Sequence, residues 1–324
     1  MATKLSPKQY VERDERLSGG HRLCAGCGAG VIVRQLLMGA KDNPVVVSNA
    51  TGCLEVSTTI YPYTAWKDSF IHSAFENAAA TISGVEAAYK SLNRQGRVKS
   101  DKPYKFLSIA GDGGSYDIGL QAISGALERG HDIVIACYDN GAYMNTGFQR
   151  SAATPRGAWT TTCPDGKESI GKTQNRKNLS AIAVAHGIPY VAQASPHNFR
   201  DLIAKAETAF ETPGPAFLNL LSPCPRGWRS ADEMGMTLAK MMVESRWWPL
   251  YEVIDGEYKL SYDPKKRTIP VRDWMKLQGR FKHLFTPANE HVLEEAQAQT
   301  DLDWERLMKL CSLSAPAESG APAE

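Results

Sequence analysis

The chain has 324 residues, of which 43% are apolar and 22% are charged, and its formal net charge is +2. This composition is typical of a globular protein, and so small a net charge gives no reason to expect nucleic acid or an anionic membrane as a partner. No apolar run reaches the roughly 20 residues that span a bilayer, and the polar N-terminus lacks the apolar core of a secretory signal, so a cytoplasmic protein is expected.

Alternating strand and helix patterns predict an α/β fold. The predicted strands cover 44–49, 105–110, 133–137, 188–193 and 216–221, and the predicted helices cover 31–38, 75–92, 118–129, 179–186 and 198–210. Residues 1–20 are polar, and we expect an arm that lies over a neighbouring subunit. Residues 141–178 show little apolar periodicity, and so long an irregular stretch inside a compact domain is usually functional.

The composition changes after Cys224. Five tryptophans follow, namely Trp228, Trp247, Trp248, Trp274 and Trp304. Residues 251–264 predict an exposed hairpin or extended segment, and the composition of 312–324 predicts a disordered tail. We therefore divide the chain into an arm (1–20), a main domain (21–230), a C-terminal extension that packs on partner subunits (231–311) and the tail (312–324).

The most informative motif is Gly111-Asp112-Gly113-Gly114 together with Asn140. Each group follows an apolar strand pattern, so an acidic and an amide side chain are presented at one edge of a parallel sheet, where ligands bind in open α/β sheets. Glycines let the backbone approach a phosphate, and Asp112 and Asn140 offer oxygen ligands for Mg²⁺. Taken alone, the same residues also fit two ordinary turns. Their spacing, with 26 residues between Gly113 and Asn140, resembles the thiamine diphosphate (ThDP) motif.

Four of the seven cysteines are placed so that they could meet. Cys24 and Cys27 form a CxxC motif with small residues between the thiols, and Cys53 and Cys224 each follow a predicted strand. If those strands end at the edge that carries Asp112, the four sulfurs converge there. Four thiolates hold a 4Fe–4S cluster or a structural zinc, and the 2+1+1 spacing favours the cluster. The alternative is that Cys53 and Cys224 are unrelated core or turn residues.

Together these motifs resemble the β subunit of 2-oxoacid:ferredoxin oxidoreductases, most closely the pyruvate-type branch. The motifs are Cys24-Ala-Gly-Cys27-Gly, Ala50-Thr-Gly-Cys53-Leu-Glu, Gly111-Asp-Gly-Gly, Tyr143-Met-Asn145-Thr146-Gly147 and Cys224-Pro, with further matches at 61–66, 71–72, 74–78 and 277–283. The resemblance implies an α/β ThDP-binding fold of the pyrophosphate-domain type. Such a fold has a mostly parallel sheet with helices on both faces, here followed by a C-terminal extension.

The resemblance also implies roles for individual residues. Asp112, Asn140 and the carbonyl of Ala142 match Mg²⁺ ligands; Gly111, Gly113, Gly114, Asn145 and Thr146 match diphosphate contacts; Cys24, Cys27, Cys53 and Cys224 match the ligands of a 4Fe–4S cluster. The main domain would therefore carry both cofactor sites. Asn145 and His72 are the candidates for contact with the substrate, although a buried structural histidine would account for His72 equally well.

The implied reaction is the oxidative decarboxylation of a 2-oxoacid, pyruvate by default, to an acyl-CoA with release of CO₂. Electrons would pass through the cluster to ferredoxin or another acceptor. The implied partners are an α subunit that carries the pyrimidine-binding domain and its catalytic Glu, and ferredoxin-like γ and δ subunits. Glu55 and Glu76 are acids of this chain, but the family gives neither of them that role.

Two departures from the family pattern leave the substrate open. Residues 67–70 and Phe148 differ from many members, so an aryl 2-oxoacid such as phenylglyoxylate, or oxalate, is an alternative to pyruvate. A more distant alternative is a non-redox ThDP decarboxylase, which has no use for four convergent cysteines. A zinc-bound scaffold subunit, in which the Gly-Asp-Gly motif is only a turn, is the non-enzymatic alternative.

Overall fold

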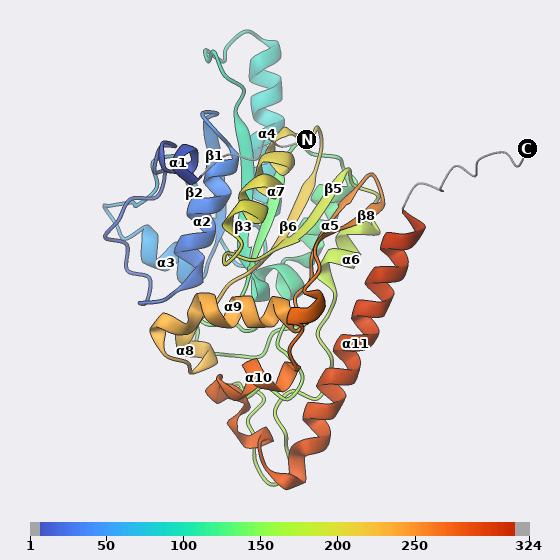
Figure 1. The fold of residues 1–324 in the computed structure, drawn as a ribbon. Helices are drawn as coiled ribbons and strands as arrows, with labels where there is room; N and C mark the ends of the chain where they lie inside the picture. Colours follow the sequence, from blue (N-terminus) through green and yellow to red (C-terminus); the bar gives the residue numbers. More distant parts are fainter. Residues whose placement is uncertain (1–6, 315–324) are drawn as a thin grey trace, which may run out of the picture.

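The computed structural model describes residues 7–314, and residues 1–6 and 315–324 lie outside the described range. Within it, eight strands form one sheet in the order β2-β1-β3-β4-β6-β5-β7-β8 (Figure 1). The strands are β1 (Val45–Ala50), β2 (Ser69–Ser73), β3 (Lys105–Gly111), β4 (Val134–Asp139), β5 (Tyr190–Ala194), β6 (Ala216–Leu221), β7 (Leu250–Ile254) and β8 (Glu257–Tyr262). The first six strands are parallel, and β7 pairs antiparallel with both β5 and β8. This confirms the expected mostly parallel sheet.

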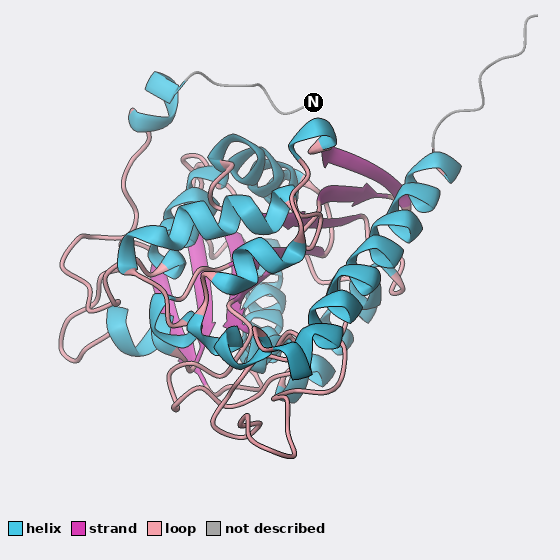
Figure 2. Ribbon diagram, turned by 60° about the horizontal axis from the view of Figure 1, so that its bottom comes forward, coloured by secondary structure: helices cyan, strands magenta, loops and turns pink. Residues whose placement is uncertain are grey.

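Helices cover both faces of the sheet, as expected (Figure 2). They are α1 (Pro7–Val11), α2 (Gly28–Gly39), α3 (Cys53–Thr58), α4 (Ala78–Arg94), α5 (Leu120–Glu128), α6 (Leu179–Val184), α7 (Phe199–Glu211), α8 (Pro225–Trp228), α9 (Gly235–Glu244), α10 (Val271–Lys276) and α11 (Glu290–Leu313). Apolar side chains of α2 and α7 cover one face, and those of α4, α5, α6 and α11 cover the other. None of the helices between residues 7 and 314 has the length and apolar character needed to cross a membrane.

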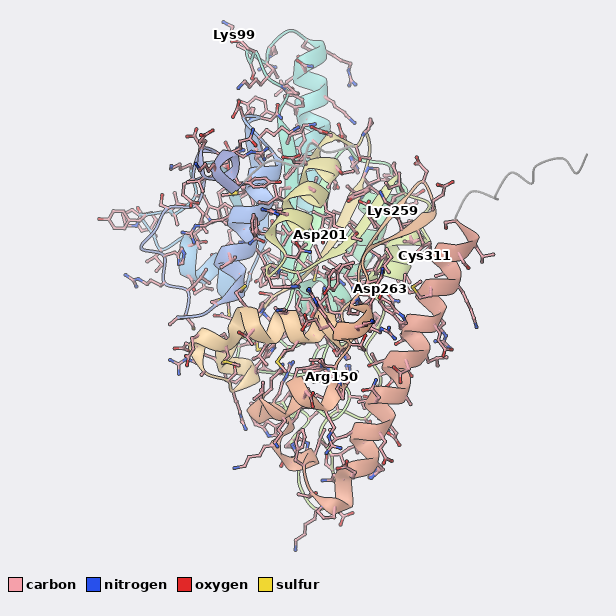
Figure 3. The ribbon with its side chains drawn as sticks, viewed as in Figure 1. Lys99, Arg150, Asp201, Lys259, Asp263 and Cys311 are labelled. Carbon is pink, nitrogen blue, oxygen red and sulfur yellow. The ribbon has the colours of Figure 1, made fainter. Side chains whose placement is uncertain are left out.

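The central strands β4 and β6 are buried along their whole length. Strands covered on both faces read as continuous apolar runs, which is why the sequence predicted them clearly. The edge strand β2 is half exposed and polar at both ends, and the sequence pattern missed it. The irregular segment 141–178, to which Arg150 belongs, lies below the sheet with α9 and α10 (Figures 1 and 3).

The aromatic C-terminal third forms a further core of this chain, and the predicted packing of 231–311 on partner subunits stays a prediction. Trp228, Trp248 and Trp274 are each 1% exposed and pack with α9, α10 and the start of α11. The β7–β8 hairpin confirms the predicted hairpin, but β7 is buried against β5 and only β8 has an exposed face.

The two ends of the described chain also differ from expectation. Residues 7–16 contact their own chain, since Tyr10 meets the ring of Phe199 on α7 and the Arg13 guanidinium lies 2.6 Å from Glu207. This part of the predicted arm packs on its own chain, its contact with a neighbour stays a prediction, and residues 1–6 lie outside the described range. The predicted tail begins too early, because α11 continues to Leu313; residues 315–324 are likewise not described.

Candidate cofactor and metal site

The glycine motif lies at the carboxyl ends of β3 and β4. Asp112 follows β3 directly, and a π-helix over Gly113–Ile118 begins immediately after it. A Cβ on Gly113 would lie 2.2 Å from the Tyr143 ring, whose hydroxyl donates a hydrogen bond to the Gly113 carbonyl at 2.8 Å. Residue 113 must therefore be glycine for the loop after β4 to pack against the loop after β3.

Three oxygen atoms converge at this edge of the sheet. The side-chain oxygen of Asn140 lies 2.8 Å from the Ala142 carbonyl oxygen and 2.9 Å from Asp112 Oδ1. All three are acceptors, so the contacts are repulsive unless the amide turns to donate its NH₂ group or a cation lies between the oxygens. Oxygens that share one octahedral Mg²⁺ at about 2.0–2.1 Å are about 2.9 Å apart. The donor set and its spacing fit Mg²⁺.

Asp112 is held in place by a neighbouring turn. Its side chain is fully buried; Oδ1 accepts a hydrogen bond from the Asn140 backbone N–H at 3.2 Å, and Oδ2 accepts one from the Ser151 hydroxyl at 2.5 Å. Burial, and then the nearby charge of Asp139, raise the pKa of Asp112 to about 8. Without a cation, the buried negative charge of the Asp112 carboxylate is therefore poorly compensated.

The turn 151–154 is itself anchored at a second point. The Thr154 hydroxyl donates to the Gly141 carbonyl at 2.7 Å, within the loop that follows β4. The buried ammonium of Lys172 donates to the carbonyls of Ala152 and Thr154, at 3.0 and 2.6 Å. Neither Ser151 nor Thr154 carried a sequence signal, because the irregular segment has no periodicity that places them.

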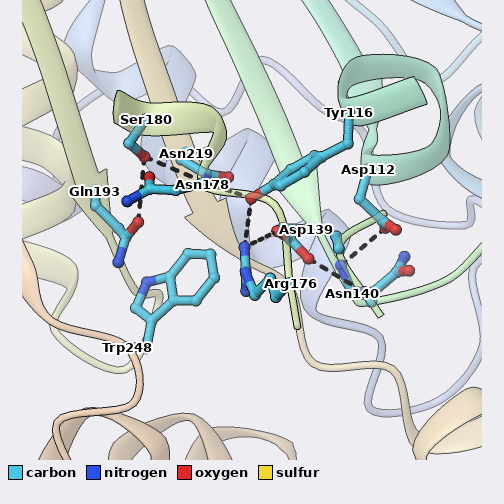
Figure 4. A network of polar contacts seen from close by, with 12 residues as sticks. Asp112, Tyr116, Asp139, Asn140, Arg176, Asn178, Ser180, Gln193, Asn219 and Trp248 are labelled. Atoms are coloured by element: carbon cyan, nitrogen blue, oxygen red, sulfur yellow. Dashed lines mark hydrogen bonds and ion pairs between the residues drawn. The ribbon is translucent and has the colours of Figure 1, made fainter. Parts of the chain in front are cut away.

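A polar network continues from this site into the sheet (Figure 4). Asp139 Oδ1 accepts from the Gly141 backbone N–H at 3.1 Å, and its Oδ2 forms an ion pair with Arg176. The same guanidinium also donates to the Tyr116 hydroxyl. Asp139 thus fixes the loop that carries Asn140 and Ala142. Asp139 directly precedes Asn140, and the sequence pattern predicted no role of its own for it.

A small cavity opens above these residues. Its lining includes Thr51, Cys53, Gly111, Gly113, Gly114, Asn140, Ala142, Tyr143, Asn145 and Thr146. Every residue matched to the diphosphate therefore borders one cavity. His72 does not line it, but His72 Nε2 lies 2.7 Å from the Thr51 hydroxyl, which does, and 3.5 Å from Glu55 Oε2. Half of the His72 side chain is exposed, so it is not a buried core histidine.

The four cysteines gather beside this cavity. Burial, and then the neighbouring Cys27 and Cys24, raise the pKa of Cys53 to about 12; burial is also the largest cause that raises the pKa of Cys224 to about 12, with Cys27 and Cys53 adding to it. These mutual effects place the thiols within electrostatic range of one another. Within residues 7–314, however, no three His, Cys, Asp or Glu side chains stand in metal-holding geometry.

Close backbone packing brings the cysteine segments together. The Gly28 N–H donates to the Pro223 carbonyl at 2.8 Å, and a Cβ on Gly28 would lie 2.5 Å from the Pro223 ring. The CxxC turn therefore rests on the residue that precedes Cys224. The Cys224 sulfur also accepts from the Gly227 N–H at 3.4 Å, at the start of α8. Four thiolates are the donor type that an iron–sulfur cluster takes, but in the described residues the side chains do not stand in ligand positions.

A buried cation lies close to both groups of residues. The Arg280 guanidinium is stacked over the Trp228 ring at 5.0 Å and lies 3.5 Å from the Asn140 carbonyl oxygen. Burial lowers the pKa of Arg280 to about 9, against the opposing effect of the nearby Cys224, Asp139 and Asp112. Arg280 lies within the 277–283 match, which predicted no role for it.

Comparisons with known proteins agree with this geometry. Residues 50–220 match the family model described as thiamine pyrophosphate enzyme, C-terminal TPP binding domain. The chain is 48% identical to the pyruvate synthase subunit PorB of Thermotoga maritima, with 94% of each chain covered. It is 47% identical to PorB of Methanocaldococcus jannaschii (92% and 94% covered) and 41% identical to the ketoisovalerate oxidoreductase subunit VorB of Pyrococcus horikoshii (93% and 94%).

A solved structure supports the fold. The 2-oxoglutarate:ferredoxin oxidoreductase of Magnetococcus marinus, solved with 2-oxoglutarate, coenzyme A and succinyl-CoA bound, matches with a TM-score of 0.54 and 21% identity. The match covers 73% of this chain and 80% of that chain. At this identity the likeness speaks for the fold alone.

Proposed function

The chain belongs to the 2-oxoacid:ferredoxin oxidoreductase family of ThDP-dependent enzymes, and from that premise we propose that it is the β subunit that binds ThDP, Mg²⁺ and a 4Fe–4S cluster. The observation that carries the proposal is the meeting of two donor sets at one sheet edge. Three oxygens converge at Asp112, Asn140 and Ala142, and four thiols gather next to the cavity above them.

In this proposal the oxygens of Asp112, Asn140 and Ala142 hold Mg²⁺, which in turn binds the diphosphate of the cofactor. The glycines of the motif, with Asn145 and Thr146, border the space for the diphosphate. Bound ThDP supplies an electron sink for the pair released when CO₂ leaves a 2-oxoacid. The chain's own contribution is to anchor and orient the cofactor and to exclude water from the buried carboxylate.

Cys24, Cys27, Cys53 and Cys224 hold the cluster in this proposal. Cys53 both borders the cofactor cavity and belongs to the cysteine group, so a cluster held by these thiols would lie beside the cofactor. Such a cluster would supply one-electron transfer toward ferredoxin or another carrier. We propose two residues as substrate contacts. Asn145 lines the cavity, and His72 contacts the hydroxyl of Thr51, which also lines it.

We assign pyruvate as the substrate, with coenzyme A as the acyl acceptor. PorB relatives named for pyruvate synthase reach 50% identity, whereas the VorB relative named for ketoisovalerate is 41% identical. An aryl 2-oxoacid remains the alternative because of Phe148, whose backbone φ of 68° gives the residue beside the cofactor motif an unusual conformation. A screen of 2-oxoacids with a viologen dye as acceptor separates these substrates.

The relatives PorB and VorB are named as subunits, so the proposal includes partner subunits. ThDP needs a carboxylate near its aminopyrimidine, and we assign that Glu to an α subunit with the pyrimidine-binding domain. Ferredoxin-like γ and δ subunits complete the electron path. We also place the complex in the cytoplasm, which cell fractionation would test.

Two sets of variants test the assignment. Asp112→Ala should abolish ThDP retention, and Asn140→Ala should weaken it less, because a neutral amide is the poorer Mg²⁺ ligand. Normal ThDP occupancy in purified Asp112→Ala protein would refute the metal assignment.

Cys53→Ser and Cys224→Ser should each lower the iron content of anaerobically purified protein and stop dye reduction. Cys311→Ser is the matched control, since Cys311 lies on α11 (Figure 3) and packs against the core formed with α4, α5 and α6, whereas Cys27, Cys53 and Cys224 pack against other cores. Full iron and full activity in Cys53→Ser or Cys224→Ser would refute the cluster assignment, and zinc in place of iron would favour a scaffold role.

A further inference from the structure

A second and larger cavity lies between α11 and the strands β5, β6 and β7. Its volume is about 450 Å³, which falls within the range of about 300–1,000 Å³ that is typical of small-molecule sites. None of the residues matched to ThDP, Mg²⁺ or the cluster lines it. The lining mixes aromatic and cationic side chains, which is the composition of a site for a charged ligand rather than of a packing defect.

The charges around this cavity are unbalanced. Five cationic side chains line it, and three of them have carboxylate partners. The pairs are Arg156–Glu295, Arg176–Asp139 and Arg306–Asp303. The other two are Lys177 and Arg246, and among residues 7–314 neither forms an ion pair; Lys177 donates to the backbone carbonyl of Tyr116. The cavity therefore carries two positive charges that a bound anion would neutralise.

Arg246 carries a buried donor that the chain leaves unsatisfied. Its φ of 64° is the left-handed conformation with which helices commonly end, since Arg246 follows the C-terminus of α9, so its backbone needs no ligand to explain it. Its Nε is buried without a hydrogen-bond partner, and its guanidinium lies over the ring of Trp304 at 4.8 Å. A buried donor without a partner at a cavity wall is a group that a bound anion would satisfy.

Aromatic side chains supply flat walls for the same space. Trp248 is fixed by a hydrogen bond from its indole N–H to the Ala194 carbonyl at 2.9 Å, and Trp247 stacks beside it with ring centroids 6.1 Å apart. The Arg176 guanidinium lies 4.6 Å from the Trp248 ring, near Asn219 (Figure 4). The buried amide oxygen of Asn219 has no hydrogen-bond partner. Rigid indoles bind a planar ring, and arginine binds phosphate.

We propose that this cavity binds a phosphorylated compound with a planar heteroaromatic ring, that is, a ligand of the nucleotide class. The ring lies against Trp247 and Trp304, and the phosphate meets Arg246 and Lys177. The site is separate from the cofactor cavity, but one ion pair links the two. Arg176 lines the larger cavity and pairs with Asp139, and the next residue, Asn140, lines the smaller cavity. This inference goes beyond the reaction assigned above and does not depend on it.

Calorimetric titration of the full chain with AMP tests the proposal without any 2-oxoacid turnover. We expect one AMP per chain, and a loss of affinity of at least about tenfold in Arg246→Gln, because a charge-assisted contact to the phosphate is removed. Arg246→Gly is the second variant, because glycine adopts the same φ without strain and so keeps the fold. Arg272→Gln is the matched control, since Arg272 is half exposed and lies outside the cavity.

Two further probes separate the parts of the ligand. Adenosine, with the ring alone, and inorganic phosphate, with the anion alone, should each bind more weakly than AMP. Absence of AMP binding at millimolar concentration, or equal binding by wild type, Arg246→Gln and Arg246→Gly, would overturn the proposal. Inorganic phosphate that binds as tightly as AMP would also overturn it, because the aromatic walls would then have no part in recognition.

Discussion

Removing the Ser151 hydroxyl is the sharpest test of how the metal site is built. That hydroxyl donates to Asp112 Oδ2 at 2.5 Å in a fully buried position. Ser151→Ala deletes this donor and leaves Asp112 and Asn140 unchanged. A hydrogen bond to a charged group contributes about 1.5–3 kcal/mol, and about 1.4 kcal/mol corresponds to tenfold in affinity. We therefore expect ThDP affinity in the presence of Mg²⁺ to fall by about tenfold to 150-fold.

The assay is a ThDP titration of the assembled complex at fixed Mg²⁺, followed by tryptophan fluorescence. Ser83→Ala is the matched control, because Ser83 is also buried and its hydroxyl donates to the Ala79 carbonyl at 2.7 Å within α4, away from the site. Both variants should lose a similar amount of thermal stability, and only Ser151→Ala should lose cofactor affinity. If the two variants bind ThDP equally well, Ser151 does not position Asp112 and the reasoning fails.

Three further predictions concern packing, pH and assembly. Gly113→Ala should fold but lose cofactor affinity, because its Cβ would lie 2.2 Å from the Tyr143 ring, whereas Gly84→Ala, with open space around it, should bind normally; equal binding would contradict this. Burial, and then Lys240, lower the pKa of His197 from 6.5 to about 4. Between pH values of about 4 and 6.5, His197 is therefore protonated in the unfolded chain and neutral in the folded chain. The free energy of unfolding should fall as the pH drops from about 6.5 to about 4, and urea unfolding of His197→Gln should show a flatter profile. The isolated chain should bind ThDP poorly and show no turnover until the pyrimidine-domain subunit is added; robust turnover by the chain alone would instead point to an internal acid such as Glu55.

The sheet edge could be predicted because its two strands are buried on both faces. Such strands are continuous apolar runs, and parallel strands present their carboxyl ends at one edge, so Asp112 and Asn140 had to be neighbours. Cys53 and Cys224 follow β1 and β6 at the same edge, and the same reasoning brought them close. The positions of these residues at the edge depend on strand direction, which the sequence pattern predicts, and not on side-chain contacts, which it does not.

What surrounds the edge could not be predicted in the same way. Ser151 and Lys172 belong to an irregular segment, where contacts depend on tertiary packing and leave no period in the sequence. The burial of the tryptophans within the chain was not predicted, because aromatic composition alone does not distinguish a core of the same chain from a partner-facing surface. Trp228 and Trp274 share a core with α9, and Trp274 lies on α10; the sequence pattern had missed both helices.

The π-helix at Gly113–Ile118 limits how the length of this region can vary. A π turn closes over one residue more than an α turn, so deleting a single residue here would convert it to ordinary α geometry. Asp117, which accepts the Ala152 backbone N–H at 3.0 Å, would then rotate away from the turn that carries Ser151. Point substitutions on the outer side of this turn should be tolerated, while deletion of one residue should not. The number of residues between β3 and α5 therefore determines the position of Asp117, and with it the geometry of the site, as the side chains do.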